Sequence, residues 1–222
     1  RVLKPLASSV RVRFPDGEIL PLEHEADGVF SAVLPGATET QDYRVLATWG
    51  DGIEHESDDP YRFAPTLGQV DIHLINEGRH EELWQVLGAR VQRYAGPMGE
   101  VVGTSFAVWA PRAKAVRVIG DFNGWDGRVH PMRLLGRSGI WELFIPGVGA
   151  GATYKYEIRG ADDVVRAKAD PMARATECPP NTGSVVEEST HEWADADWME
   201  KRATADVHHG PMSVYEVHLG SW

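Results

Sequence analysis

The amino-acid sequence predicts an all-β protein made of two tandem, immunoglobulin-like β-sandwiches joined by a short helix. Short segments in which apolar and polar residues alternate recur along the chain, separated by turns rich in Gly, Pro and Asp. This pattern is typical of antiparallel sandwiches. Matching segments also recur at a nearly constant distance, which indicates that one structural unit occurs twice.

The repeat places the first sandwich at residues 1–70 and the second at 98–188. The aligned pairs are Pro5/Pro111 and Val10–Arg13/Val116–Ile119 at an offset of 106, and Gly28–Phe30/Gly139–Trp141, Tyr43/Tyr154 and Asp59–Pro60/Asp170–Pro171 at an offset of 111. The second copy is therefore five residues longer between its first two strands. The extra length falls where the segment GDFNGWDG begins, at Gly120.

Residues 71–97 are expected to form a helical spacer between the sandwiches. The acidic pair Glu81-Glu82 suits a first helical turn, and Leu83, Val86 and Leu87 follow at helical spacing. Gly88 is expected to end this helix.

The carboxyl-terminal part divides into a linker and one strand. Residues 189–212 are polar and without a clear period, so we interpret them as a surface linker. Residues 213–219 alternate again and predict a strand. Because the chain starts at Arg1 within a strand pattern and stops at Trp222 within a motif, we expect it to be a fragment.

The composition and net charge limit the classes of molecule that the chain can bind. Hydrophobic residues make up 42% and charged residues 25%, the balance of a globular protein. A formal net charge of −11 argues against nucleic acid or an anionic membrane, which require a basic surface, but not against a neutral ligand. The single cysteine, Cys178, leaves no internal disulfide and favours a reducing cytoplasm. No apolar run approaches the length of a membrane span.

The loop that begins at Gly120 carries the main candidate site. It holds two glycines, Asn123 and Trp125, and follows an alternating strand. An indole presented by such a loop has two common partners: the protein core, or the C–H face of a sugar ring. The local sequence leaves both alternatives open.

Five blocks together resemble the amino-terminal half of bacterial 1,4-α-glucan (glycogen) branching enzymes of the α-amylase-like superfamily. The blocks are FAVWAPRAKAVRVIGDFNGWDGRVHPMR, SGIWELFIPG, YKYEIRG, ADP and SVYEVHLGSW. The first four are similar to a glycogen-binding (CBM48-type) module. The last is similar to the first strand of the catalytic (β/α)8 barrel, so the resemblance implies a truncated barrel at residues 213–222.

The resemblance also implies site residues and an activity. Trp125 is expected to stack on a glucose ring, and Lys155, Asn123 and Asn181 to hydrogen-bond the sugar. The second aromatic platform of such modules has no counterpart in Gly160–Val165, so weak binding is expected. The parent enzyme would cut α-1,4 bonds and re-form them as α-1,6 branches without a cofactor.

No catalytic or metal-binding residues are expected within this chain. Retaining glycosyl transfer needs a pair of carboxyl groups about 5–5.5 Å apart, and in the resembling family these come from later barrel strands. Glu23-His24-Glu25 and Glu54-His55-Glu56 lack the spacing of a zinc site on a helix.

We therefore expect the glucan-binding region of a cytoplasmic, monomeric branching enzyme, which binds α-glucan and packs on its own barrel. Two alternatives stay open: a non-catalytic sandwich that docks a protein through the Trp125 loop, and the same region of a debranching or trehalose-forming relative.

Overall fold

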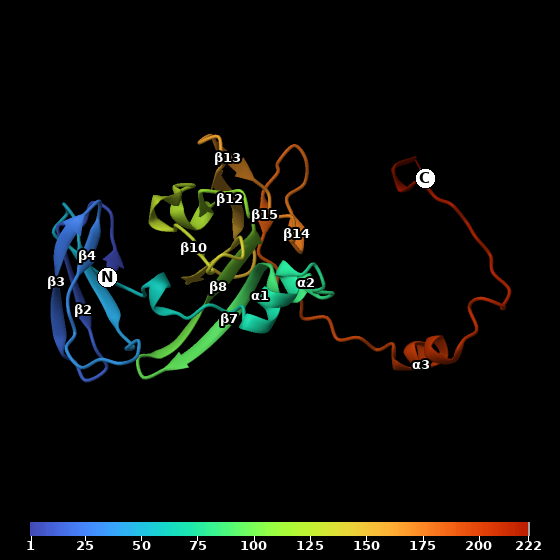
Figure 1. Cartoon of the computed structure of the whole chain (residues 1–222), viewed down its shortest axis with the longest axis horizontal. Helices are drawn as coiled ribbons and strands as arrows, with labels where there is room; N and C mark the ends of the chain where they lie inside the picture. Colours follow the sequence, from blue (N-terminus) through green and yellow to red (C-terminus); the bar gives the residue numbers. More distant parts are fainter. Residues whose placement is uncertain (222) are drawn as a thin grey trace. The chain divides into compact units, whose positions relative to one another are not determined.

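The computed structural model describes residues 1–221, whose regular secondary structure consists mainly of antiparallel strands (Figure 1). The chain forms two compact units, Arg1–Glu188 and Ser189–Trp222. The first unit contains both sequence repeats. We call β1 to β6 the first repeat and β7 to β15 the second repeat.

The first repeat is a six-stranded antiparallel arrangement in the order β1-β4-β3-β2-β5-β6. Strand β3 changes partners along its length: its first half pairs with β2 and its second half with β4. Apolar side chains from β1, β2, β4 and β5 meet in one core beside this bend. The strands are β1 (Val2–Leu3), β2 (Ser9–Arg13), β3 (Ile19–Ala26), β4 (Val29–Ser31), β5 (Arg44–Thr48) and β6 (Glu54–Ser57).

The second repeat consists of two sheets with a shared core. One sheet has the order β10-β11-β8-β7; in the other, β12 pairs with β9, β13 and β15. Side chains such as Phe106 and Leu143 from the first sheet and Val118 and Tyr156 from the second are buried together. The strands are β7 (Gly88–Gly96), β8 (Gly99–Trp109), β9 (Ala115–Gly120), β10 (Arg133–Leu134), β11 (Ile140–Pro146), β12 (Thr153–Arg159), β13 (Val165–Lys168), β14 (Ala175–Thr176) and β15 (Ser184–Val185).

The internal repeat predicted from the sequence is confirmed at the level of strand register. Three strand pairs of the first repeat recur in the second with the same partners facing each other. These are Leu3↔Val29 and Trp109↔Ile140, Val12↔Val45 and Val118↔Tyr156, and Val45↔Ser57 and Tyr156↔Lys168. The offset of 106 therefore relates the first strands of the two repeats, and the offset of 111 relates the later strands of the same duplicated topology.

A glycine packed on a proline recurs in both repeats. Gly28 and Gly139 have φ angles of +79° and +76°, a region that residues with a Cβ atom adopt at a cost. A Cβ atom on Gly28 would lie 2.6 Å from Cα of Pro5, and one on Gly139 would lie 2.7 Å from Cα of Pro111. Only glycine fits both requirements, which explains why these residues align.

A buried tyrosine–aspartate hydrogen bond also recurs. The hydroxyl of Tyr43 donates to Oδ2 of Asp59 at 2.6 Å, and that of Tyr154 donates to Oδ2 of Asp170 at 2.7 Å. Tyr156 adds a second bond to Asp170 at 3.1 Å. Burial raises the pKa of Asp170 above its ordinary value, although these hydrogen bonds oppose the shift.

The expected spacer at 71–97 is only partly helical. Helix α1 (Gln69–Asn76) lies before the predicted helix. Its C-cap is Glu77, and Gly78 follows with a φ of +68°, which is typical of the residue after a helix. The predicted helical residues supply only one turn, α2 (Leu83–Val86). Residues 88–96, expected within the spacer, instead form β7, because Ala89 and Val91 pack on the second core.

The connection between the repeats is fixed to the second repeat by a buried carboxylate. Oε1 of Glu142, which is 1% exposed, accepts hydrogen bonds from the backbone N–H and the hydroxyl of Thr66, both at 2.6 Å. Phe63 packs on Phe144 with a ring separation of 4.5 Å. The short helix η1 (Pro60–Arg62) leads into this segment.

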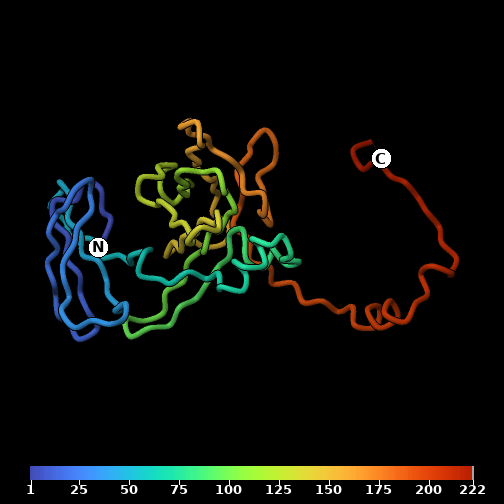
Figure 2. Tube along the Cα trace, viewed as in Figure 1, coloured from blue at the N-terminus to red at the C-terminus, as the bar shows by residue number. Residues whose placement is uncertain are grey.

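The tip of the β7–β8 hairpin contacts the first repeat. The backbone N–H of Met98 donates to Oδ2 of Asp42 at 2.9 Å, and its carbonyl accepts from Arg44 at 3.0 Å. Figure 2 shows the long green hairpin reaching the blue strands at this point. The two repeats therefore touch through the hairpin as well as through their connection.

The second unit differs from the sequence expectation. The segment expected as a linker contains helix α3 (Ala196–Thr204), whose tryptophan Trp198 is exposed. The strand predicted at residues 213–219 does not form: this segment is irregular and ends in the helical turn η4 (Leu219–Ser221). A parallel barrel strand requires neighbours on both sides, and residues 1–221 offer none to this segment. Trp222, the last residue of the segment 213–222 that was expected to form the first strand of the barrel, lies outside the described residues.

Candidate glucan-binding site

The loop after β9 has a tightly specified backbone. Helix η2 (Asp121–Asn123) follows Gly120, and the side-chain oxygen of Asn123 accepts from the backbone N–H of Gly120 at 2.9 Å. The amide of Asn123 donates to the carbonyl of Val118 at 3.0 Å. The N–H of Trp125 in turn donates to the carbonyl of Gly120 at 2.8 Å. The contribution of Asn123 visible in the structure is to the shape of this loop.

Trp125 has a strained backbone and an exposed side chain. Its φ angle is +62°, in the left-handed region that a bulky residue enters only when its surroundings demand it. The residue is 44% exposed, whereas Trp141 of the second core is 8% exposed. The alternative in which the loop tryptophan fills the core is therefore wrong. The loop holds an indole out to solvent.

Lys155 points away from the core, as the alternation in YKY predicts. Its neighbours Tyr154 and Tyr156 are fully buried, and Lys155 itself is only partly buried. Its ammonium group donates to the hydroxyl of Thr182 at 2.7 Å. The sequence analysis did not identify Thr182, because 27 residues separate it from Lys155 and only the pairing of β12 with β15 brings them together.

Asn181 lies beside Thr182 in the exposed turn between β14 and β15. Its amide donates to Oε1 of Glu177 at 3.0 Å, and Oε2 of Glu177 accepts from the backbone N–H of Gly183 at 2.8 Å. Glu177 thus closes the turn. The side-chain carbonyl oxygen of Asn181 has no hydrogen-bond partner among residues 1–221.

Three segments of the site meet around Tyr154. Gly120 and Ser184 are the strand partners of Tyr154 on its two sides. Asp121 further ties the loop to β12, since its Oδ2 accepts from the backbone N–H of Thr153 at 3.1 Å. The Trp125 loop, Lys155 and the turn with Asn181 and Thr182 therefore lie at one end of the sheet that contains β9, β12 and β15.

Residues 1–221 contain no group of three or more His, Cys, Asp or Glu side chains placed to hold a metal ion. The Glu54-His55-Glu56 segment lies in strand β6, and its two glutamates pair with Arg11 and Arg13 of β2, which lies on the other side of β5. Among the same residues, no helix has the length and apolar character of a membrane span.

Two family models match the chain. Residues 1–61 match the amino-terminal domain of the α-1,4-glucan branching enzyme GlgB, and residues 86–173 match carbohydrate-binding module 48, described as the isoamylase N-terminal domain. The chain is similar, over its whole length, to the amino-terminal part of 1,4-α-glucan branching enzymes. Over its whole length it is 59% identical to the 1,4-α-glucan branching enzyme GlgB of Thermobifida fusca and 54% identical to that of Rhodococcus jostii. It spans 30% of the length of these relatives.

Solved structures of other proteins also align with the chain. A pullulanase from Anoxybacillus sp. LM18-11 aligns over 84% of this chain and 25% of its own, with 18% identity and a TM-score of 0.37.

Proposed function

We propose that this chain is the α-glucan-binding region of an enzyme that cleaves α-1,4 bonds of glucan and re-forms them as α-1,6 branches. The chain would hold the donor glucan, and the catalytic carboxylates would belong to the parent protein's barrel. No cofactor is needed for such a transfer, which uses a pair of carboxyl groups.

The exposed indole of Trp125 carries this proposal. A left-handed backbone at a tryptophan costs free energy, of order 1–3 kcal/mol, and persists only where the surroundings enforce it. Three hydrogen bonds of Asn123 and Trp125 enforce it here. Their combined effect is to present an aromatic face at the end of the sheet that also carries Lys155, a combination that suits a sugar ring and its hydroxyl groups.

The sugar contacts follow from the side chains around Tyr154. Trp125 would stack on one glucose ring, and Lys155 would donate to a hydroxyl with the N–H groups that Thr182 does not use. Asn181 would accept from a second hydroxyl. Asn123 would act on the sugar mainly by holding Trp125 in place. A single platform with a few exposed hydrogen bonds gives only ~4 kcal/mol, which corresponds to millimolar affinity.

The wider architecture extends this proposal. Both repeats would be immunoglobulin-like sandwiches, at residues 1–70 and 98–188, with the spacer and linker between and after them. Residues 213–222 would become the first strand of the catalytic barrel when the parent supplies neighbouring strands. The parent would be a cytoplasmic monomer in which this region packs on its own barrel.

Affinity electrophoresis in gels that contain glycogen tests the proposed site. We expect Trp125→Ala to be retarded less than the unsubstituted chain. Trp198→Ala is the matched control, because Trp198 is 58% exposed and lies on α3, outside the second repeat. Equal retardation of the Trp125 variant, with its fold intact by circular dichroism, would overturn the proposal and favour a protein-docking role for the loop.

A further inference from the structure

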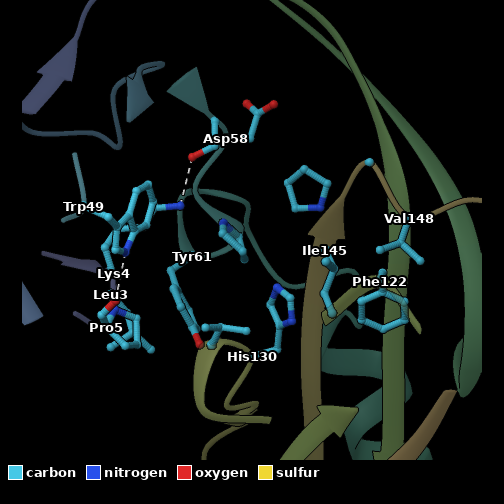
Figure 3. A pocket seen from close by; sticks show the side chains of 15 residues that line it. Leu3, Lys4, Pro5, Trp49, Asp58, Tyr61, Phe122, His130, Ile145 and Val148 are labelled. Carbon is cyan, nitrogen blue, oxygen red and sulfur yellow. Dashed lines mark hydrogen bonds between the residues drawn. The ribbon is translucent and has the colours of Figure 1, made fainter. Parts of the chain in front are cut away.

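A cavity of about 570 Å³ lies between the two repeats. Phe122, close to Trp125 in the same loop, lines this cavity, but Trp125 itself does not. Small-molecule sites in proteins commonly occupy 300–1,000 Å³. We call it the seam cavity and define it by Lys4, Trp49, Tyr61, Phe122, Val129 and His130. Figure 3 shows Lys4 and Trp49 on one side and Phe122 on the other, with His130 at one end.

The walls of the seam cavity are mainly aromatic and aliphatic. Trp49 is fixed by a hydrogen bond from its indole N–H to the carbonyl of Pro5 at 3.1 Å. Tyr61 is fixed by its hydroxyl, which donates to the carbonyl of Pro131 at 2.7 Å. The indole N–H of Trp49 and the hydroxyl proton of Tyr61 are thus used within the protein, so neither residue has a free donor, and both can offer a ligand their ring faces.

His130 presents a fixed hydrogen-bond donor. Because Oδ1 of Asn123 accepts from Gly120, the Asn123 amide nitrogen must be the atom that faces Nδ1 of His130, at 2.9 Å. Nδ1 is therefore the acceptor, and the proton of the neutral ring is on Nε2. Burial, together with the charge of Lys4, lowers the pKa of His130 to about 4, so this neutral form is the one present at pH 7. Nε2–H has no hydrogen-bond partner among residues 1–221.

The ammonium group of Lys4 supplies further hydrogen-bond donors, and its positive charge is offset by nearby carboxylates. Its ammonium group uses one N–H for the hydroxyl of Ser57, at 2.9 Å. Burial lowers the pKa of Lys4, and the nearby carboxylates Asp58 and Asp59 oppose this shift. Asp58 is itself paired with Arg44 and Arg62. Arg62 also pairs with Asp42, so three cations face three carboxylates. Because these charges balance, an anion gains little, while a neutral molecule with acceptor oxygens can use the free donors.

We propose that the seam cavity is a second carbohydrate site, which binds one or two glucose residues of an α-glucan by their apolar ring faces and hydroxyl oxygens. Trp49 and Tyr61 supply the apolar faces, and Lys4 and His130 donate to the hydroxyls. The site needs both repeats, since Lys4 and Trp49 come from the first and His130 from the second. A bound glucan would therefore tie the two repeats together.

Nuclear magnetic resonance with maltotriose as the probe tests this site separately from Trp125. We expect the Nε2 signal of His130 and the indole signal of Trp49 to shift on titration, in the chain itself and equally in Trp125→Ala. Lys4→Met is expected to weaken this binding about tenfold, because it removes a charged donor.

A second pair of variants blocks the cavity without touching a polar group. Val129→Phe is expected to abolish the seam shifts by filling the space, while Val129→Ile, the matched control, retains them. Unshifted His130 and Trp49 signals at saturating maltotriose, equal shifts in both Val129 variants, or loss of the shifts in Trp125→Ala would each overturn the seam site. A shifted His130 with an unshifted Trp125 would instead overturn only the function proposed above.

Discussion

Substituting alanine at two glycines of one turn separates backbone strain from steric exclusion. Gly136 and Gly139 both have positive φ angles, +61° and +76°. A Cβ atom on Gly136 would have no neighbour within 4 Å, whereas one on Gly139 would lie 2.7 Å from both Cα and Cβ of Pro111. Carbon atoms pack favourably at about 3.5–4.0 Å. Gly139→Ala must therefore displace backbone that the neighbouring strands hold.

The magnitudes follow from these two terms. A left-handed alanine costs about 1 kcal/mol, which is the whole expected loss for Gly136→Ala. Overpacking adds about 1–3 kcal/mol for Gly139→Ala, so its expected loss is about 2–4 kcal/mol. Urea denaturation followed by tryptophan fluorescence measures both. Equal losses in the two variants would refute the reasoning that the contact with Pro111, rather than the φ angle alone, selects glycine here.

Three further predictions concern buried polar groups and the carboxyl-terminal segment. Tyr43→Phe should destabilise the chain by about 1.5–3 kcal/mol and Tyr154→Phe by less, because Tyr156 still donates to Asp170 while Oδ2 of Asp59 loses its only tyrosine; the reverse order in urea denaturation would contradict this. The pKa of His130 falls from 6.5 to about 4 on folding. The neutral ring therefore contributes about 3 kcal/mol to the free energy of unfolding above pH 6.5, and this contribution is lost as the pH falls toward 4. If the free energy of unfolding of His130→Gln fell just as steeply between these pH values, this explanation would be refuted. Deleting residues 213–222 should leave the thermal midpoint unchanged and reduce aggregation, because Val214 and Leu219 are 83% and 85% exposed; a large fall in the midpoint would show that the segment is integrated into the fold.

The sequence predicted the duplicated topology well because its signals are local and strict. Val10 and Val12 alternate with Arg11 and Arg13, as a half-buried strand requires, and the structure buries both valines. Gly28 and Gly139 mark positions that only glycine can occupy. Such constraints depend on the backbone of one turn or strand, so they survive divergence of the remaining residues and can be aligned by eye.

The errors arose where the outcome depends on distant partners. The sequence before Glu81 is weakly patterned and did not reveal α1, which ends at Asn76 and is followed by the left-handed Gly78. Residues 88–96 were assigned to the expected spacer, so the alternation that makes β7 a strand was not recognised. The predicted strand at 213–219 has the correct residue pattern but no neighbouring strand among residues 1–221, and pattern alone does not form a sheet.

The candidate site shows the same division. The sequence supplied Trp125, Lys155, Asn123 and Asn181 through resemblance, and the roles of these residues toward a sugar remain predictions. The sequence did not supply Thr182, whose contact with Lys155 depends on strand pairing. The seam cavity was equally hidden, because its two donors, Lys4 and His130, are brought together only by the contact of the two repeats.

The most direct test of the central claim is the indole N–H signal of Trp125 during a titration with maltoheptaose. We predict that this signal shifts progressively with a millimolar dissociation constant, while the signals of the exposed tryptophans Trp109, Trp193 and Trp198 stay in place. A Trp125 signal that stays in place at saturating maltoheptaose, or that moves no more than those three, would contradict the assignment of this loop as the glucan-binding site.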